Sequence, residues 1–154
     1  MRLLGIIILL ITTILAAAGT SSADNFIDLQ AIKAIESSGN PFAFNARTKC
    51  YGLFQISEVC LQEFNQLEKK QYQPRDLFDP AINEEIADWY FQRLQYMLSY
   101  YDVKVTVATL IASYNWGIGN VVRWYRSGAR PEALPAETRD YIDKYVLLSA
   151  EEVL

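Results

Sequence analysis

A helix that has to stop abruptly is the feature that most restricts how this chain can fold. The helix is expected to begin at about Asn25 and to bury one face, because apolar or small residues recur at helical spacing. These residues are Ile27, Ala31, Ala34, Ile35 and Ser38. Gly39 suits a left-handed C-terminal cap, and Asn40 is driven out of helical dihedral angles by Pro41. The helix therefore ends here, with Glu36 in its last turn.

The position of Glu36 has a chemical consequence. The carboxylate faces the negative end of the helix dipole, and apolar neighbours would remove water from it. Both effects disfavour ionisation and raise the pKa of the carboxyl group, which suits a general acid at neutral pH. A solvated glutamate in a frayed last turn is the alternative, and this stretch alone does not exclude it.

The start of the chain is typical of a secretory signal peptide. Arg2 precedes an apolar run from Leu3 to Leu15, and small residues follow up to Ala23. We expect residues 1–23 to be removed by cleavage after Ala23, with Ala18 as the alternative site. An uncleaved anchor is less favoured, because the run is shorter than the roughly 20 apolar residues that span a bilayer. The protein is therefore expected to be exported, to a periplasmic or extracellular location, with residues 24–154 as one domain.

Charge and composition exclude several classes of function. The chain has 14 basic and 18 acidic residues, and loss of Arg2 with the leader would increase the excess of acid by one. Without runs of basic residues, nucleic acid is not an expected partner. The sequence contains no histidine, which removes the usual proton shuttle and the commonest metal ligand. We therefore expect no metal site.

Cys50 and Cys60 are the only cysteines. In an oxidising compartment they could form a disulfide, which we expect here. Closing a loop of this size is worth on the order of 2 to 3 kcal/mol in the loop-entropy model. Two separate buried thiols remain the alternative, because bond geometry cannot be read from a sequence.

The middle of the chain predicts a loop followed by two helices. Residues 42–56 lack helical periodicity and should form a loop with at most a short hairpin. Ser57 is a good N-cap for a helix to about Glu68. Asp79 should cap a long helix with Pro80 at its first position, after a connector over residues 71–79. The buried stripe of this helix is expected to comprise Ile82, Ile86, Trp89, Tyr90, Leu94 and Met97.

The last third predicts three more helices. The first follows Asp102 and ends at the glycines of residues 114–119. Asn120 can cap a short amphipathic helix that stops near Gly128, and a closing helix should run from Ala136 to about Leu148. The expected fold class is mainly α, a single domain with several helices around one core and little strand.

Four short motifs occur in order along the chain. They are Glu36–Pro41, Tyr51–Ile56, Ser113–Gly117 and Glu137–Tyr141. Together they resemble the motifs of the soluble lytic transglycosylase domain, a family of the lysozyme-like superfamily. The resemblance implies a lysozyme-like α fold that cleaves the β-1,4 bond between N-acetylmuramic acid and N-acetylglucosamine. The strand-like segment after Cys50 is also similar to animal lysozyme and α-lactalbumin, but those proteins carry eight cysteines.

The spacing of the carboxylates favours one mechanism over another. Glycoside hydrolysis usually needs two carboxylates, yet no Asp or Glu lies between Glu36 and Glu58. Glu36 would then protonate the leaving oxygen and afterwards act as the base that lets the C6 hydroxyl close a 1,6-anhydro ring. The resemblance implies no metal or organic cofactor. A hydrolytic muramidase and a catalytically idle peptidoglycan-binding scaffold are the alternatives.

The resemblance also implies a set of residues that bind substrate. They are Ser37, Asn45, Gln55, Tyr114, Asn115 and Tyr141. The amides could hold an N-acetyl group and the tyrosines could contact the sugar, but loop or core packing would also explain them. Two positions depart from the family pattern: Phe54 stands where methionine is commonest, and Asn45 stands where a small hydroxyl residue is usual.

The expected partner is the glycan strand of peptidoglycan, bound by a monomer. No additional wall-binding domain is recognisable in the sequence. This resembles the small stand-alone enzymes that open the wall for a secretion, conjugation or pilus apparatus, which is therefore an expected partner as well.

Overall fold

A computed structural model describes residues 27–151, which fold mainly into α-helices, as expected. The expected leader and its cleavage site lie outside the described residues. The elements in chain order are α1 (Leu29–Ser37), β1 (Phe44–Asn45), β2 (Cys50–Tyr51), β3 (Ile56–Ser57), α2 (Glu58–Glu68), η1 (Pro74–Phe78), α3 (Pro80–Tyr100), α4 (Val107–Trp116), α5 (Ile118–Arg126), η2 (Pro131–Ala133) and α6 (Ala136–Glu151). Within this part of the chain no helix combines the length and the apolar character that a membrane crossing needs.

Helix α1 confirms the abrupt stop but not the expected start. It begins at Leu29, because the Asp28 side chain caps it by accepting hydrogen bonds from the backbone N–H groups of Gln30 (2.8 Å) and Ala31 (3.3 Å). At the other end Ser38, not Gly39, is the C-cap residue, with φ of 53°. The Ser38 N–H donates to the Ala34 carbonyl, so Glu36 lies in the last turn.

The loop after α1 folds into a three-stranded antiparallel sheet with strands of two residues each. Phe44 pairs with Tyr51, and Cys50 pairs with Ser57. Gly52 comes directly after β2 and has a φ of +74°. A Cβ atom at this position would lie 2.3 Å from the Leu77 carbonyl oxygen. Only glycine allows the backbone to approach so closely.

The two predicted helix caps in the middle of the chain are confirmed. The Ser57 side chain caps α2 by accepting from the Cys60 N–H, and Asp79 caps α3 with Pro80 at the first position. The predicted buried stripe of α3 was only partly right, because Ile86 and Leu94 are buried but Ile82, Trp89, Tyr90 and Met97 are half-buried. The most buried residues of α3 are Asn83, Ile86, Ala87, Phe91, Leu94 and Leu98. Helix α3 packs against α2, α4, α5 and the sheet. Which of its residues are buried therefore depends on several neighbouring elements.

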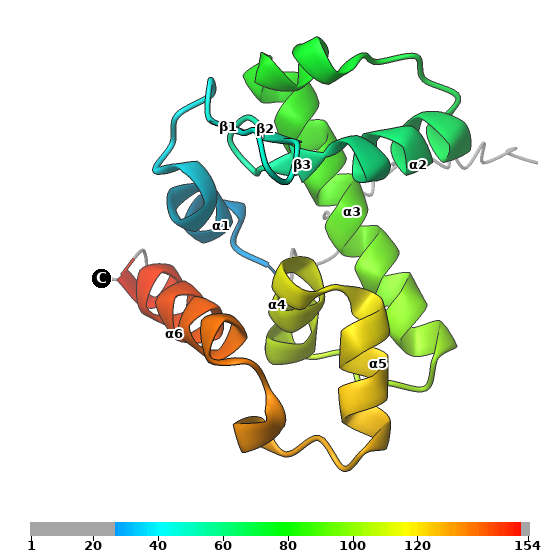
Figure 1. Ribbon diagram of the computed structural model, residues 1–154, viewed down its shortest axis with the longest axis vertical. Helices are drawn as coiled ribbons and strands as arrows, with labels where there is room; N and C mark the ends of the chain where they lie inside the picture. The colour runs from blue at the N-terminus through cyan, green and yellow to red at the C-terminus, as the bar shows by residue number, and fades with distance from the viewer. Residues whose placement is uncertain (1–26, 152–154) are drawn as a thin grey trace, which may run out of the picture.

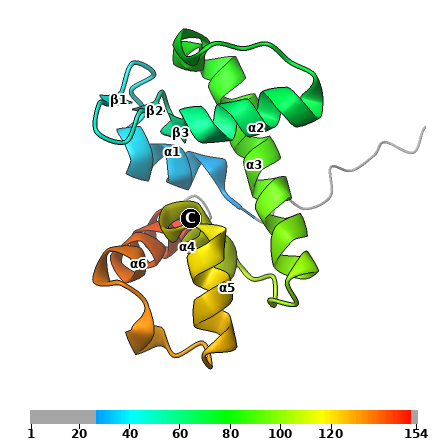
Figure 2. The same cartoon turned by 45° about the vertical axis from the view of Figure 1, so that its right-hand side comes forward.

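The C-terminal helices pack against one another and against the first helix. Helix α4 packs against both α5 and α6, and α6 also packs against α1, which brings the two ends of the described chain together (Figure 1). The same arrangement is visible after rotation, where α2 continues from β3 and crosses α3 (Figure 2). Helix α5 begins at Ile118, so the prediction that Asn120 caps it was wrong. The Asn120 amide instead donates to the Trp116 carbonyl at 2.6 Å.

The expected disulfide is not formed, because Cys50 and Cys60 are both free thiols. The Cys50 thiol lies on β2 and is directed to the Thr48 carbonyl, at 3.7 Å. Cys60 lies in the first turn of α2 and belongs to the hydrophobic core. Burial raises the pKa of its thiol to about 12, which keeps it protonated and unreactive. The stability attributed to the bridge is therefore absent in this structure.

Candidate active site

Glu36 and Tyr141 meet across the contact between α1 and α6. The Tyr141 hydroxyl donates a hydrogen bond of 2.6 Å to Oε1 of Glu36. A second tyrosine of α6, Tyr145, accepts a bond of 2.8 Å from the backbone N–H of Asp28, at the start of α1. Helix α6 thus holds both ends of α1, which sets the position of the Glu36 carboxyl group.

The environment of Glu36 favours its protonated form. Burial raises the pKa of its carboxyl group above the usual value near 4.5, and the hydrogen bond from Tyr141 opposes this in part. Burial and the neighbouring Glu36 carboxylate raise the pKa of Tyr141 as well. Tyr141 therefore remains a hydrogen-bond donor at any physiological pH. A protonated carboxylic acid beside a permanent donor can lose its proton to a substrate and have the resulting charge stabilised.

Tyr114 connects helix α4 to the loop between β2 and β3. Its hydroxyl donates to the Phe54 carbonyl at 2.5 Å, and its ring stacks on Phe91 with centroids 4.6 Å apart. Burial, and then the charge of Glu36, raise the pKa of the Tyr114 hydroxyl well above its usual value. The structure therefore brings Tyr114 close to Glu36, with its hydroxyl engaged by backbone.

Ser37 and Gln55 hold the same loop from two other directions. The Ser37 hydroxyl, directly after Glu36, lies 2.8 Å from the Leu53 carbonyl and 3.2 Å from that of Lys33. The Gln55 amide nitrogen donates to the carbonyls of Gly52 (3.0 Å) and Ala43 (3.3 Å). These bonds satisfy loop backbone, which was the alternative for Gln55.

Asn83 is the polar residue of this region that the sequence did not single out. It is fully buried on α3, and its side chain bonds three backbone groups. Its Oδ1 accepts from the Phe54 N–H (2.8 Å), and its Nδ2 donates to the carbonyls of Leu77 (2.8 Å) and Tyr51 (3.0 Å). Asn83 thus fixes the loop that Tyr114 and Ser37 contact to helix α3. An asparagine in a helix that is otherwise apolar on its inner face was the available signal.

The two remaining predicted residues have different surroundings. Asn115 accepts a bond of 2.9 Å from the buried Thr138 hydroxyl, which joins α4 to α6 beside Tyr141. Asn45 is exposed, and its Oδ1 accepts from the N–H groups of Arg47 (3.1 Å) and Thr48 (3.3 Å). It closes its own hairpin turn and is not joined to the other site residues by these bonds.

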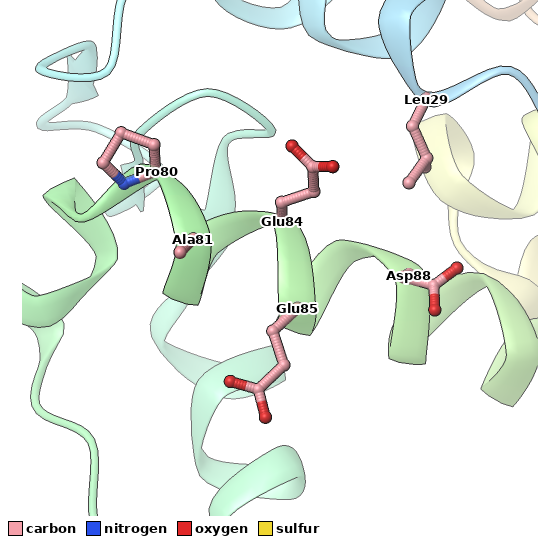
Figure 3. Close-up of a pocket in the computed structure, with 6 residues that line it drawn as sticks. All are labelled: Leu29, Pro80, Ala81, Glu84, Glu85 and Asp88. Carbon is pink, nitrogen blue, oxygen red and sulfur yellow. The ribbon is translucent and has the colours of Figure 1, made fainter.

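Three hollows adjoin these elements, and one of them, of about 420 Å³, lies between α1 and α6 beside Ala34, Ile35 and Lys144. A pocket of about 150 Å³ lies beside the loop, lined by Cys50, Gln55, Ile56, Ser57, Cys60, Tyr90 and Tyr114. A larger hollow of about 630 Å³ lies between the first half of α3 and Leu29 of α1, and its carboxylates are Glu84, Glu85 and Asp88 (Figure 3). Glu85 is engaged by Lys70 at 3.0 Å and by the Tyr72 hydroxyl at 3.2 Å. Over residues 27–151 no three acidic or cysteine side chains are grouped as metal ligands would be.

Comparison with known proteins gives one match. The family model described as the transglycosylase SLT domain matches residues 15–134. The match therefore includes Glu36, Gln55 and Tyr114 and ends before α6, which carries Tyr141. No curated protein and no solved structure matches the chain.

Proposed function

The chain belongs to the transglycosylase SLT domain family, and from this membership we propose that Glu36 is the single acid and base of a peptidoglycan lyase. The family gives the chain a peptidoglycan-degrading function of the lytic transglycosylase type, carried out in the cell envelope. The residue that performs the chemistry and the course of the reaction form the proposal.

The observation that carries the proposal is the hydrogen bond of 2.6 Å from Tyr141 to Oε1 of Glu36. Because Oε1 accepts this bond, the proton of the neutral acid resides on the other carboxyl oxygen, which can donate it to substrate. Burial raises the pKa of Glu36, so the neutral acid persists to higher pH than it would in an exposed glutamate. Both requirements for a general acid are thus met at one residue.

The reaction then runs in two steps on the muramyl residue. Glu36 gives its proton to the glycosidic oxygen, and the bond from that oxygen to C1 breaks while the substrate's own N-acetyl group stabilises C1. The Glu36 carboxylate, stabilised by Tyr141, next removes the proton of the C6 hydroxyl, whose oxygen bonds to C1 and closes the 1,6-anhydro ring. Glu36 is protonated again at the end, and no water is consumed.

The surroundings of Glu58 favour this course over hydrolysis. A hydrolytic muramidase would use a second carboxylate to direct water or to attack C1. Glu58 is the first acid after Glu36 in the sequence, and it accepts a bond of 2.8 Å from the Tyr51 hydroxyl and pairs with Lys49 at 3.6 Å. A carboxylate with both oxygens engaged in this way is a weaker base towards water than a free one.

We assign the other residues supporting roles. Gln55 could present its amide oxygen, and Asn115 its amide nitrogen, to an N-acetyl group, because the other amide atom of each is engaged within the protein. Ser37 and Tyr114 position the loop around Phe54. The protein would act as an exported monomer that opens the wall locally for a secretion, conjugation or pilus apparatus, in keeping with the family resemblance.

The deciding experiment is mass spectrometry of muropeptides released from purified peptidoglycan by the wild type, Glu36→Gln and Glu58→Gln. The proposal expects anhydro-muropeptides from the wild type and from Glu58→Gln, and a loss of at least about 100-fold in rate for Glu36→Gln. Reducing ends without the anhydro ring would contradict the lyase. Unchanged release by Glu36→Gln would contradict the role of Glu36.

A further inference from the structure

Charge is distributed very unevenly along this acidic chain. The sequence has 18 acidic residues, yet none lies between Val103 and Pro131, a stretch that covers α4 and α5. The same stretch contains four basic residues, namely Lys104, Arg123, Arg126 and Arg130. The segment is therefore positively charged in a protein whose net charge is negative.

Three of these basic residues gather at the end of α5. Arg123 and Arg126 are three positions apart, which places them on the same side of the helix, and both are exposed. Arg130 follows after the turn, where the Trp124 indole N–H donates to its carbonyl oxygen at 2.8 Å. This bond holds the backbone of Arg130 against α5. We call Arg123, Arg126 and Arg130 the arginine patch.

The patch is not used by acidic neighbours in the described part of the chain. The ion pairs there involve Lys49, Lys70, Arg75 and Arg93. The Arg123 guanidinium donates to the Asn120 amide oxygen, a neutral partner. Arginines in a last turn also stabilise the helix dipole, which could explain Arg123 and Arg126. Arg130 lies beyond the helix, so this explanation does not extend to the whole patch.

We propose that the arginine patch binds the free carboxylates of the peptide stems that project from the glycan strand. This inference rests on the proposed function, because it concerns a second contact with the same polymer. Guanidinium groups bind carboxylates in bidentate geometry, and exposed arginines without acidic partners are available for it. The occupant is therefore the stem peptide of peptidoglycan.

The position of α5 supports this assignment. Helix α4 carries Tyr114, whose hydroxyl senses the charge of Glu36, and α5 starts directly after Gly117 (Figure 1). At 1.5 Å per residue, Arg123 lies about 9 Å along the axis from that junction. A strand bound at Glu36 could thus place a stem on the patch. The first half of α3, with Glu84 and Asp88, would repel the same carboxylates (Figure 3).

The test compares two uncrosslinked substrates, glycan strands with their peptide stems and strands from which an amidase has removed them. Arg123→Gln/Arg126→Gln is the test variant, and Lys69→Gln/Arg75→Gln is a control with the same change in net charge at exposed positions elsewhere. The test variant should show a KM at least about fivefold higher on stem-bearing strands, with kcat unchanged. The control should behave like the wild type, and Arg123→Lys/Arg126→Lys, which keeps the charge but loses the bidentate geometry, should have a KM between those of the wild type and the test variant.

Two further readouts separate the patch from a structural role. On stem-free strands the test variant should match the wild type, and in about 1 M salt the difference on stem-bearing strands should disappear because charges are screened. Equal losses on both substrates would contradict the proposal. So would a wild type that treats both substrates alike, although it would leave the proposed function intact. Absence of anhydro products from the wild type on either substrate would instead refute the proposed function.

A different anionic occupant is the third outcome that the design detects. Vesicles containing an anionic phospholipid are mixed with the wild type and the test variant, and sedimentation measures binding. Loss of vesicle binding in the test variant, with stem preference unchanged, would assign the patch to phosphate headgroups and overturn the proposal.

Discussion

Replacing Asn83 with alanine would remove the anchor beneath the loop that carries Phe54. The substitution deletes three hydrogen bonds, to the Phe54 N–H and to the carbonyls of Leu77 and Tyr51. Asn83 is fully buried, so water cannot easily replace its amide. All three backbone groups would lose this partner at once.

The expected cost is large for a single polar substitution. A buried donor or acceptor left without a partner costs about 1 to 3 kcal/mol, and partial rearrangement of the loop will recover some of this. We therefore expect Asn83→Ala to lower the free energy of unfolding by roughly 3 to 5 kcal/mol. For a domain with a total stability of about 5 to 15 kcal/mol, the variant would remain folded only at moderate temperature.

Activity should fall as well, because the anchored loop is part of the site. Tyr114 donates to the Phe54 carbonyl and Ser37 lies within hydrogen-bond distance of the Leu53 carbonyl, so displacement of this loop would move groups beside Glu36. A misplacement of about 1 Å can cost on the order of 100-fold in rate. Urea unfolding followed by circular dichroism gives the stability, and the release of anhydro-muropeptides at 10 °C gives the rate of the folded fraction.

Asn65→Ala is the matched control. The Asn65 side chain also bonds backbone, with Nδ2 donating to the Tyr72 carbonyl (2.8 Å) and Oδ1 accepting from the Tyr72 N–H (3.0 Å). It is half-buried and fixes a connector between α2 and η1, so its loss should cost about 1 to 2 kcal/mol and leave the rate unchanged. If Asn83→Ala lost no more stability than Asn65→Ala, the reasoning about buried unpaired groups would be wrong.

Three other predictions concern titratable groups. Burial raises the pKa of Glu36 above its ordinary value near 4.5, so the wild type loses stability as the pH rises from 4.5 through the pKa in the folded state. Glu36→Gln should therefore melt a few degrees higher than the wild type at pH 7 and show no such advantage at pH 3. Thermal unfolding at the two pH values measures this difference. Tyr141→Phe removes the hydrogen bond that lowers the pKa of Glu36, so the alkaline limb of the pH–rate profile should move to higher pH. The same change should lower kcat roughly 10-fold or more. An alkaline limb that does not move would refute the effect of Tyr141 on the pKa of Glu36. Because Cys60 is buried with a pKa of about 12, a colourimetric disulfide reagent at pH 8 should label only Cys50 in the native protein and both thiols in urea; immediate labelling of both would contradict the burial of Cys60.

Interactions that close within a few residues were predictable from the sequence. Ser57 caps α2, and Asp79 with Pro80 starts α3, at the positions expected. A cap needs only a side-chain oxygen and the backbone of the next turn, so its energetics are local. The stop after Glu36 belongs to the same class, although Ser38, with φ of 53°, is the C-cap residue and Gly39 follows it with φ of +77°.

Patterns that depend on several neighbours were predicted less well. The buried face of α3 was partly wrong, because α3 contacts other elements on several sides and periodicity alone does not say which side is the most enclosed. Asn120 was a plausible cap by composition, but Gly117 occupies that position and α5 begins earlier. The two cysteines were compatible with a bridge, and the structure keeps both as free thiols.

The candidate site also combines features that are local in the sequence with contacts that depend on tertiary packing. The sequence alone determined that a carboxylate stands in the last turn of a helix and that no other acid follows before Glu58. Only the tertiary structure decided that Tyr141 bonds Glu36 across 105 positions of sequence, and that Asn83 supports the loop beside it. Caps and turns are set by the torsional and hydrogen-bonding preferences of adjacent residues. The contact of α1 with α6 depends on how the whole core packs, which no local stretch of sequence encodes.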